Sequence, residues 1–264
     1  MSLESSRSLG VTRIYASRPL AVAASIAIAS VSALAGNSPQ RGSATAVAAQ
    51  PAMTIPGVAP IQSRPGGRSY SEWAAAWWQW ALQTPATNHP ANGGPCSTGQ
   101  TGHVWFVGVN FAPAGPLART CTVPTGTALN LQLISSAFFA FLNDPPETRT
   151  EDFIRSAAEC SDFSAQQLRI DGVDYANVAS RYLERSTVFK VQLPVDNVLG
   201  LTEAVVPNLT LSPAVDMGYY LFLHPLPVGT HLVEWQVSMD CPGLGGVITQ
   251  QQSLTISVLP KGRS

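Results

Sequence analysis

The pattern of hydrophobic and polar positions changes its period along the chain. Within residues 69–85, SYSEWAAAWWQWALQTP, apolar residues recur at helical spacing. At about 100° per residue, one stripe of this segment holds Tyr70, Trp73, Trp77 and Trp80. Polar side chains gather on the opposite side. The segment is therefore predicted to be an amphipathic helix whose aromatic stripe packs in the core.

The ends of this helix are marked by the sequence as well. Ser69 followed three residues later by Glu72 forms a capping box, in which each side chain bonds a free backbone amide of the first turn. Pro85 cannot continue a helix and ends it. Trp78 lies to one side of the stripe, and we expect it to reach a surface groove.

Beyond residue 100 the apolar positions alternate, which is typical of β-strands. The segment HVWFVGV at 103–109 is apolar on both faces, as a central strand would be. The alternating or two-faced segments predict strands at 103–109, 127–134, 186–193, 218–223, 230–237 and 253–259.

Turn signals separate these strands. RIDGVDY at 169–175 predicts a hairpin, with Asp171 and Gly172 in its tight turn. A second helix is expected at about 149–161, begun by a capping box of Thr148 and Glu151.

Many short strands with regular turns indicate an all-β fold. We therefore predict one β-sandwich or jelly-roll-like domain with one or two packed helices, covering residues 69–260.

The first part of the chain has a different character. Residues 19–35 are uncharged, follow three arginines and end in Ala-Leu-Ala, which predicts a secretory signal peptide over 1–35. The alternative is an uncleaved membrane anchor. The apolar run is shorter than the roughly 20 residues that a membrane-spanning helix needs. Residues 36–68 are rich in Pro, Gly, Ala and Ser and are predicted to be a disordered linker. Residues 261–264 form a short tail.

Composition excludes several partners. Charged residues make up 12% of the chain, about half the usual share, and the net charge is −1. Residues 1–35 carry three Arg and one Glu, so the remainder has a net charge of −3. Because this remainder has no basic cluster, we expect neither nucleic acid nor an anionic membrane as partner. We also expect no stable membrane span once the signal peptide is cleaved.

The four cysteines favour an oxidising compartment. Cys96, Cys121, Cys160 and Cys241 all follow the predicted signal peptide, and none forms a C-x-x-C pair. Three pairings are open to them. We favour Cys96 with Cys121 and Cys160 with Cys241, because the first closes a loop within one region of the sequence; the alternative is that some remain free and buried.

No catalytic or metal-binding pattern is present, so we expect no cofactor and no metal, and we assign no catalytic residue. The histidines, none in a ligand pair, are His89, His103, His224 and His231. Paired carboxylates could hydrolyse a glycoside. The candidates each have a structural explanation in a cap, a turn or an outward strand position: Glu72, Asp144, Asp171 and Glu234.

Amide side chains are the candidate binding groups. Outward strand positions are assigned to Asn130, Gln132, Gln192 and Gln236, with Gln250 and Gln252 as further candidates. Amides donate and accept hydrogen bonds, which suits sugar hydroxyls and other polar polymers. The predicted ligand-binding set consists of Trp78, Asn130, Gln132, Gln192 and Gln236. The alternative is an ordinary solvated sheet face.

The order of several motifs carries a resemblance. SYSEWAAAWWQWAL is followed by GHVWFVGV, RTCTVPTGTALNLQLI, GYYLFLHPLPVGTHLVEWQV and SLTISVL. This order resembles a family of uncharacterised exported bacterial proteins with a Trp-rich N-terminal helix and a mainly β domain, over most of 69–259. The resemblance implies export and a mainly β fold, and it supplies no activity, cofactor or site residue. Where relatives are aromatic after TALN, this chain has LQLI.

These observations favour a non-catalytic extracytoplasmic binding or cell-envelope protein, located in the periplasm, on the cell surface or outside the cell. Its ligand would be a glycan or another polar extracellular polymer. Two alternatives stay open: a secreted hydrolase acting on such a polymer, and a structural or surface-interaction protein.

Overall fold

A computed structural model describes residues 55–108, 110–111, 116–162, 167–175, 179–244 and 246–260. The predicted signal peptide at 1–35, the linker up to residue 54 and the tail at 261–264 lie outside the described residues. They stay predictions.

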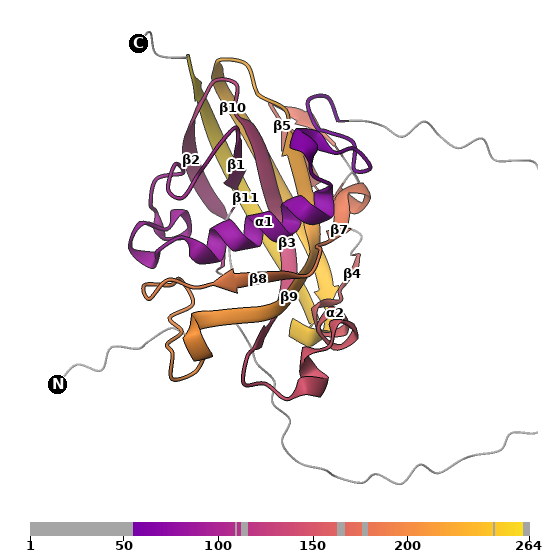
Figure 1. Ribbon diagram of the computed structural model, residues 1–264. Helices are drawn as coiled ribbons and strands as arrows, with labels where there is room; N and C mark the ends of the chain where they lie inside the picture. The colour runs from indigo at the N-terminus through magenta and orange to yellow at the C-terminus, as the bar shows by residue number, and fades with distance from the viewer. Residues whose placement is uncertain are drawn as a thin grey trace, which may run out of the picture. The chain divides into compact units, whose positions relative to one another are not determined.

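The described chain is mainly β, with two mixed sheets and two α-helices, which confirms the coarse fold prediction (Figure 1). One sheet has five strands: β1 (Val104–Val107), β3 (Ala128–Phe141), β9 (Thr210–Leu223) and β7 (Leu183–Arg185) follow one another, and β8 (Phe189–Gln192) also pairs with β9. β1 is parallel to β3, and the other pairs are antiparallel.

The other sheet has six strands. Its order is β2 (Leu117–Pro124), β11 (Gly246–Leu259), β10 (Gly229–Cys241), β5 (Gln167–Ile170) and β6 (Val173–Asp174), and β4 (Ser161–Asp162) also pairs with β10. β2 runs parallel to β11, whereas the long β10 and β11 form an antiparallel hairpin. Trp235 of β10 donates its indole N–H to the Leu133 carbonyl of β3 at 2.9 Å, which joins the two sheets.

All six segments predicted from alternation contain strands, and the hairpin of β5 and β6 is confirmed. Its turn places Asp171 and Gly172 at positive φ, 48° and 81°. Three strands were not predicted: β2, β4 and β7. The expectation of a central strand at 103–109 is wrong, because β1 pairs with β3 alone among the described strands and forms a sheet edge. On one of its faces, Phe106 packs against Trp73 and Trp80 of α1.

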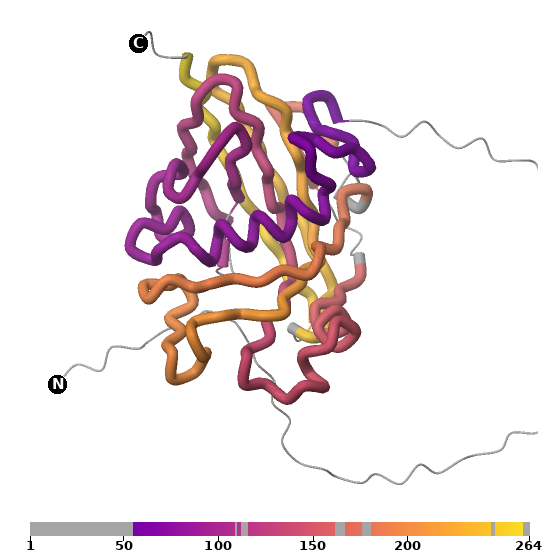
Figure 2. The backbone as a smooth tube through the Cα atoms, in the orientation of Figure 1, coloured from indigo at the N-terminus to yellow at the C-terminus, as the bar shows by residue number. Residues whose placement is uncertain are grey.

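Helix α1 spans Tyr70–Gln83 and lies across the five-stranded sheet (Figure 2). The capping box of Ser69 and Glu72 is confirmed: Ser69 Oγ accepts from the Glu72 amide, and Glu72 accepts from the Ser69 amide at 2.6 Å. Thr84 caps the other end, just before Pro85. The sequence therefore specified both ends of this helix.

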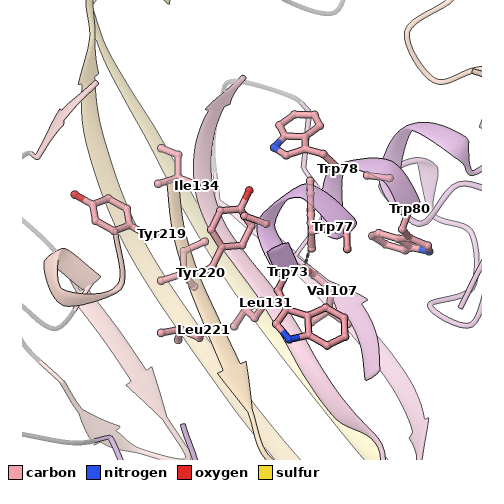
Figure 3. Close-up of a cluster of buried hydrophobic side chains, with 14 of the residues drawn as sticks. Trp73, Trp77, Trp78, Trp80, Val107, Leu131, Ile134, Tyr219, Tyr220 and Leu221 are labelled. Carbon is pink, nitrogen blue, oxygen red and sulfur yellow. Dashed lines mark hydrogen bonds between the residues drawn. The ribbon is translucent and has the colours of Figure 1, made fainter. Parts of the chain in front are cut away.

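The tryptophans of α1 are sealed against the sheet (Figure 3). Trp73, Trp77 and Trp80 expose 7%, 1% and 7% of their surface, which confirms their predicted place in the core. Each indole N–H finds a backbone carbonyl, at 2.8 Å on Pro65, 2.9 Å on Val107 and 3.1 Å on Thr98. Burying an aromatic side chain removes about 150–250 Å² from water, so this one face contributes several kcal/mol.

The segment before α1 differs from the prediction of a disordered linker over 36–68. Ile55, Val58 and Ala59 are buried in the core. The Ala59 amide donates to the Phe222 carbonyl at 2.9 Å, and the Ala59 carbonyl accepts from the Tyr70 hydroxyl at 2.6 Å. Three apolar residues in a Pro- and Gly-rich segment have no period, so the sequence pattern could not reveal this packing.

The second helix, α2, spans Glu151–Ala158 and packs on β3 and β9. Its existence confirms the prediction, but the cap does not. Thr150, not Thr148, is the N-cap, and its hydroxyl accepts from the Phe153 amide at 3.3 Å. Residues 146–149 form a separate 3-10 turn, which moves the start of the helix by two residues.

Both disulfides of the favoured pairing are present. Cys96 is bonded to Cys121, and Cys160 is bonded to Cys241. The first ties the loop after α1 to β2, and the second ties the residues after α2 to the end of β10. Two disulfides indicate an oxidising, extracytoplasmic environment. No helix in the described ranges is long and apolar enough to span a bilayer.

Candidate functional site

A groove with a volume of about 610 Å³ runs across the six-stranded sheet, on the face turned away from the other sheet. Five strands contribute to it: β2, β11, β10, β5 and β6. The polar and aromatic side chains that line it include Gln167, Arg169, Asp174, Tyr175, Glu234, Gln236, Gln251 and Ser253.

Three glutamines form a row across this groove. Gln236 of β10 is directly opposite Gln251 of β11 on one side and opposite Gln167 of β5 on the other. All three side chains are exposed. Because directly paired residues share a face and lie about 5 Å apart, the three amides line up over two strand spacings. None of the three makes a side-chain hydrogen bond within the described part of the chain, so their donors and acceptors are available to a ligand.

A charged row lies beside the amide row. Two residues along each strand, Ser253, Glu234 and Arg169 are paired in register, and Arg169 is paired in turn with Asp174 of β6. Arg169 Nε lies 3.2 Å from Asp174 Oδ1. Glu234 is half-buried and has no ion pair among the described residues. The row therefore carries a net negative charge, which disfavours a polyanionic ligand.

Local sequence explains why these side chains face outward. In β10, Val233, Trp235 and Val237 are buried, so alternation sends Glu234 and Gln236 to the opposite face. In β5, Leu168 and Ile170 are buried and send Gln167 and Arg169 outward. Tyr175 flanks the row, and its amide donates to the Leu168 carbonyl at 2.8 Å, which fixes its backbone beside β5.

Of the sequence-predicted binding set, only Gln236 lies in this groove. Gln192 is exposed, as predicted, but it belongs to β8 in the other sheet. There it bonds its own surroundings: Nε2 donates to the Asn208 carbonyl at 2.6 Å, and Oε1 accepts from the Thr210 hydroxyl at 2.9 Å. The structure does not bring Gln192 and Gln236 together.

The outward orientation expected for Trp78, Asn130 and Gln132 is wrong. Their exposed fractions are 8%, 0% and 6%. Alternation along β3 does separate them from Leu129 and Leu131, but their face of the sheet lies under α1 and not under water. Figure 3 shows Trp78 above this face, on the same side as the Tyr220 hydroxyl. These three residues cannot contact a polymer at the surface.

A buried polar cluster occupies this interface. Asp216 of β9 is almost fully buried and accepts from the Tyr220 hydroxyl at 2.5 Å, while its backbone amide donates to Ser186 Oγ at 2.8 Å. Burial raises the pKa of Asp216 to about 7, an effect that hydrogen bonding from Tyr220 partly opposes. The Trp78 indole nitrogen also faces this carboxyl, although neither it nor Asp216 Oδ1 makes a hydrogen bond of normal geometry.

Asn130 is the least satisfied member of this interface. Its Nδ2 and Oδ1 are both buried, with no hydrogen-bond partner in the described part of the chain. An unpaired buried polar group costs about 1–3 kcal/mol. We therefore expect Asn130→Leu, which removes both unpaired atoms at similar volume, to raise the free energy of unfolding by about 1–3 kcal/mol, measured by urea denaturation.

Asn197 offers the matched control for this substitution. It is also buried, but its Nδ2 donates to the Leu201 carbonyl at 2.8 Å and its Oδ1 accepts from the Leu201 amide at 3.0 Å. Asn197→Leu should therefore destabilise the protein. If both substitutions lower stability equally, the Asn130 amide is satisfied in solution and the inference is wrong.

The remaining candidates have structural roles. Asp171 pairs with His231, with Oδ2 2.8 Å from Nδ1, and accepts from the Leu232 amide at 2.8 Å. Burial lowers the pKa of His89, whose ring lies 2.7 Å from the Ala81 carbonyl. Asp144 accepts from the Phe141 amide at 2.7 Å. Within the described ranges, no three His, Cys, Asp or Glu side chains converge as a metal site would require.

Sequence reasoning missed Gln167, Gln251 and Ser253. The signal for Gln251 was present, since Leu254, Ile256 and Val258 face inward and alternation places Gln252 with them. The outward position expected for Gln252 is therefore wrong: Gln252 is buried, at 4% exposed, and Gln251 is the exposed neighbour. Gln167 was missed because the predicted hairpin began at Arg169, whereas β5 begins two residues earlier. The turn signal at Asp171 and Gly172 does not indicate where the strand before it begins.

Comparison with known protein families, with curated proteins and with solved structures finds no match for this chain. The residues that line the groove are therefore the basis for assigning a function.

Proposed function

We propose that this protein is an exported, non-catalytic binding protein that holds a polar extracellular polymer, a glycan by chemical class, across the outer face of its six-stranded sheet. In this proposal the two sheets pack as a β-sandwich, and the N-terminal segment directs export. The resemblance to exported bacterial proteins and the two disulfides support the extracytoplasmic location.

The observation that carries the proposal is the register of Gln251, Gln236 and Gln167. Each amide can both donate and accept, so a row of three suits a chain of hydroxyl groups, which also donate and accept. The groove is lined by residues of five strands, so a polymer can lie across the sheet. Tyr175 lies beside the row and offers an apolar ring face for a sugar.

A hydrolase is less well supported by the same residues. Glycoside hydrolysis needs two carboxyl groups facing each other across the bond. Here Asp174 is engaged by Arg169, and Arg169 stands between Asp174 and Glu234 in the row. Glu234 alone lacks the second group.

The test is an array of neutral, amino and acidic oligosaccharides, followed by titration of the strongest binder. We expect Gln236→Ala and Gln251→Ala each to weaken binding about threefold to tenfold, since a hydrogen bond is worth about 0.5–1.5 kcal/mol. Folding should be unchanged, because neither side chain is hydrogen-bonded within the described protein.

Gln83→Ala is the matched control, an exposed glutamine at the end of α1, remote from the six-stranded sheet. It should bind as the wild type does. Gln192→Ala tests the site expected from the sequence. Loss of binding in Gln192→Ala with no change in Gln236→Ala would move the site to β8, and release of reducing ends that Glu234→Gln abolishes would replace binding with hydrolysis.

A further inference from the structure

Strand β2 places one charged side chain on its interior face. Burial alternates so that Arg119, Cys121 and Val123 lie on the side facing the protein interior, while the residues between them are exposed. Cys121 and Val123 belong to the core. β2 is also the outermost strand of its sheet. An inward charge on an edge strand can serve to discourage edge-to-edge pairing, so this structural role must be separated from any binding role.

A cavity of about 220 Å³ adjoins Arg119. Trp80 and Phe106 form one wall, with stacked rings whose centroids are 5.6 Å apart at 24°. Leu254, Gly93 and Gly94 also line it. The cavity is thus apolar on one side and cationic on the other, and its volume lies below the range of about 300–1,000 Å³ typical of drug-sized ligands.

The Arg119 guanidinium retains unused donors. Nη1 donates to the Pro90 carbonyl, Nη2 donates to the Ala91 carbonyl at 2.9 Å, and Nε is buried without a partner in the described chain. A guanidinium has five N–H donors, so three remain. A carboxylate can accept from two such donors at once, one with each oxygen.

No ion pair among the described side chains supplies a counter-charge for this cation. Arg119 takes part in none of the ion pairs of the described residues. Burial lowers the pKa of Arg119, as expected for a cation that is partly removed from water without a carboxylate beside it. Such a charge costs free energy until an anion pairs with it.

We propose that this cavity binds a small carboxylate, with the carboxylate on the unused donors of Arg119 and the apolar part of the ligand against Trp80 and Phe106. The site is separate from the groove on the outer face of the sheet, and it does not depend on the proposed glycan binding. The ring nitrogens of His89 are already engaged by the Ala81 carbonyl and the Ala91 amide.

The experiment compares benzoate with benzamide, its neutral isostere, on the full chain. Trp80 in the wall provides a fluorescence signal, and thermal shift gives an independent one. Benzoate should bind the wild type and benzamide should not. Arg119→Met should weaken benzoate binding by about tenfold to a hundredfold, the loss expected for charge-assisted hydrogen bonds.

Arg119→Lys separates the two roles of this residue. Lysine keeps the charge but cannot bridge the Pro90 and Ala91 carbonyls as the guanidinium does, so it should bind benzoate more weakly than the wild type and better than Arg119→Met. A purely structural arginine would lower stability in both variants and show no difference between benzoate and benzamide. That result, or tighter binding of sulfate than of benzoate, overturns the proposal. If Arg119→Met does not fold, the lysine variant and the benzoate–benzamide comparison decide.

Discussion

Asp216→Asn is expected to stabilise the protein by about 4 kcal/mol at pH 8 and to leave it unchanged at pH 3. Burial holds the pKa of Asp216 at about 7 in the folded protein, against 3.8 as the ordinary value. Between those values the folded state binds more protons at this group than the unfolded state does. The free energy of unfolding therefore falls as pH rises through this window, and it falls no further above pH 7.

Asparagine removes this dependence because it is neutral at every pH. Its side-chain oxygen can still accept from the Tyr220 hydroxyl, and the backbone bond to Ser186 is unaffected. The measurement is urea denaturation of both proteins from pH 3 to pH 8, with the difference between them plotted against pH. Comparing the two proteins cancels the contribution of every other titrating group.

Glu203→Gln is the control for loss of a carboxylate, since Glu203 is exposed in a loop. It should change stability little at any pH. A difference between Asp216→Asn and wild type that stays constant from pH 3 to pH 8 would show that Asp216 has the same pKa in the folded and the unfolded protein, and would contradict the raised pKa.

Removing the Cys160–Cys241 bond is expected to cost about 4.5 kcal/mol of unfolding free energy, and removing the Cys96–Cys121 bond about 3.5 kcal/mol. The reason is the loop that each bond closes in the unfolded chain. The sequence separations are 81 and 25 residues, and the entropy that a crosslink removes grows with the logarithm of loop length. The double-alanine variants, Cys160→Ala with Cys241→Ala and Cys96→Ala with Cys121→Ala, test this by denaturation.

The order of the two effects is the sharper part of this prediction. Cys160 and Cys241 are both buried, so their replacement also leaves a small cavity that adds to the difference, whereas Cys96 is only partly buried. Reduction of the wild-type protein serves as the control for the substitutions themselves. A larger loss from the Cys96–Cys121 pair would show that the unfolded chain already holds residues 160 and 241 close together.

Much of the fold could be predicted because its signals are local. Ser69, Glu72 and Pro85 bounded α1, and the inward residues of β8, β10 and β11 followed from alternation. The local signals failed where neighbours compete. Thr148 and Thr150 are both capable caps, and the preceding 3-10 turn decided between them. β2 was missed although its alternation is visible in the burial pattern, because Arg119 interrupts its apolar face.

The candidate site was predicted only at Gln236. Alternation correctly separated the polar from the apolar side chains of β3 and of β10. It gave no information on what covers the polar side. On β3 that side holds Asn130 and Gln132 beneath α1, whereas on β10 it holds Glu234 and Gln236 in the open groove.

The sequence by itself determined the helix α1, most of the long strands, the inward residues of β8, β10 and β11, and the favoured disulfide pairing. These depend on residues a few positions apart, whose relative directions are set by the backbone period. Only the tertiary structure decided which polar faces meet water and which glutamines align across strands. Those depend on the packing of α1 on one sheet and on strand register, which join residues far apart in the chain.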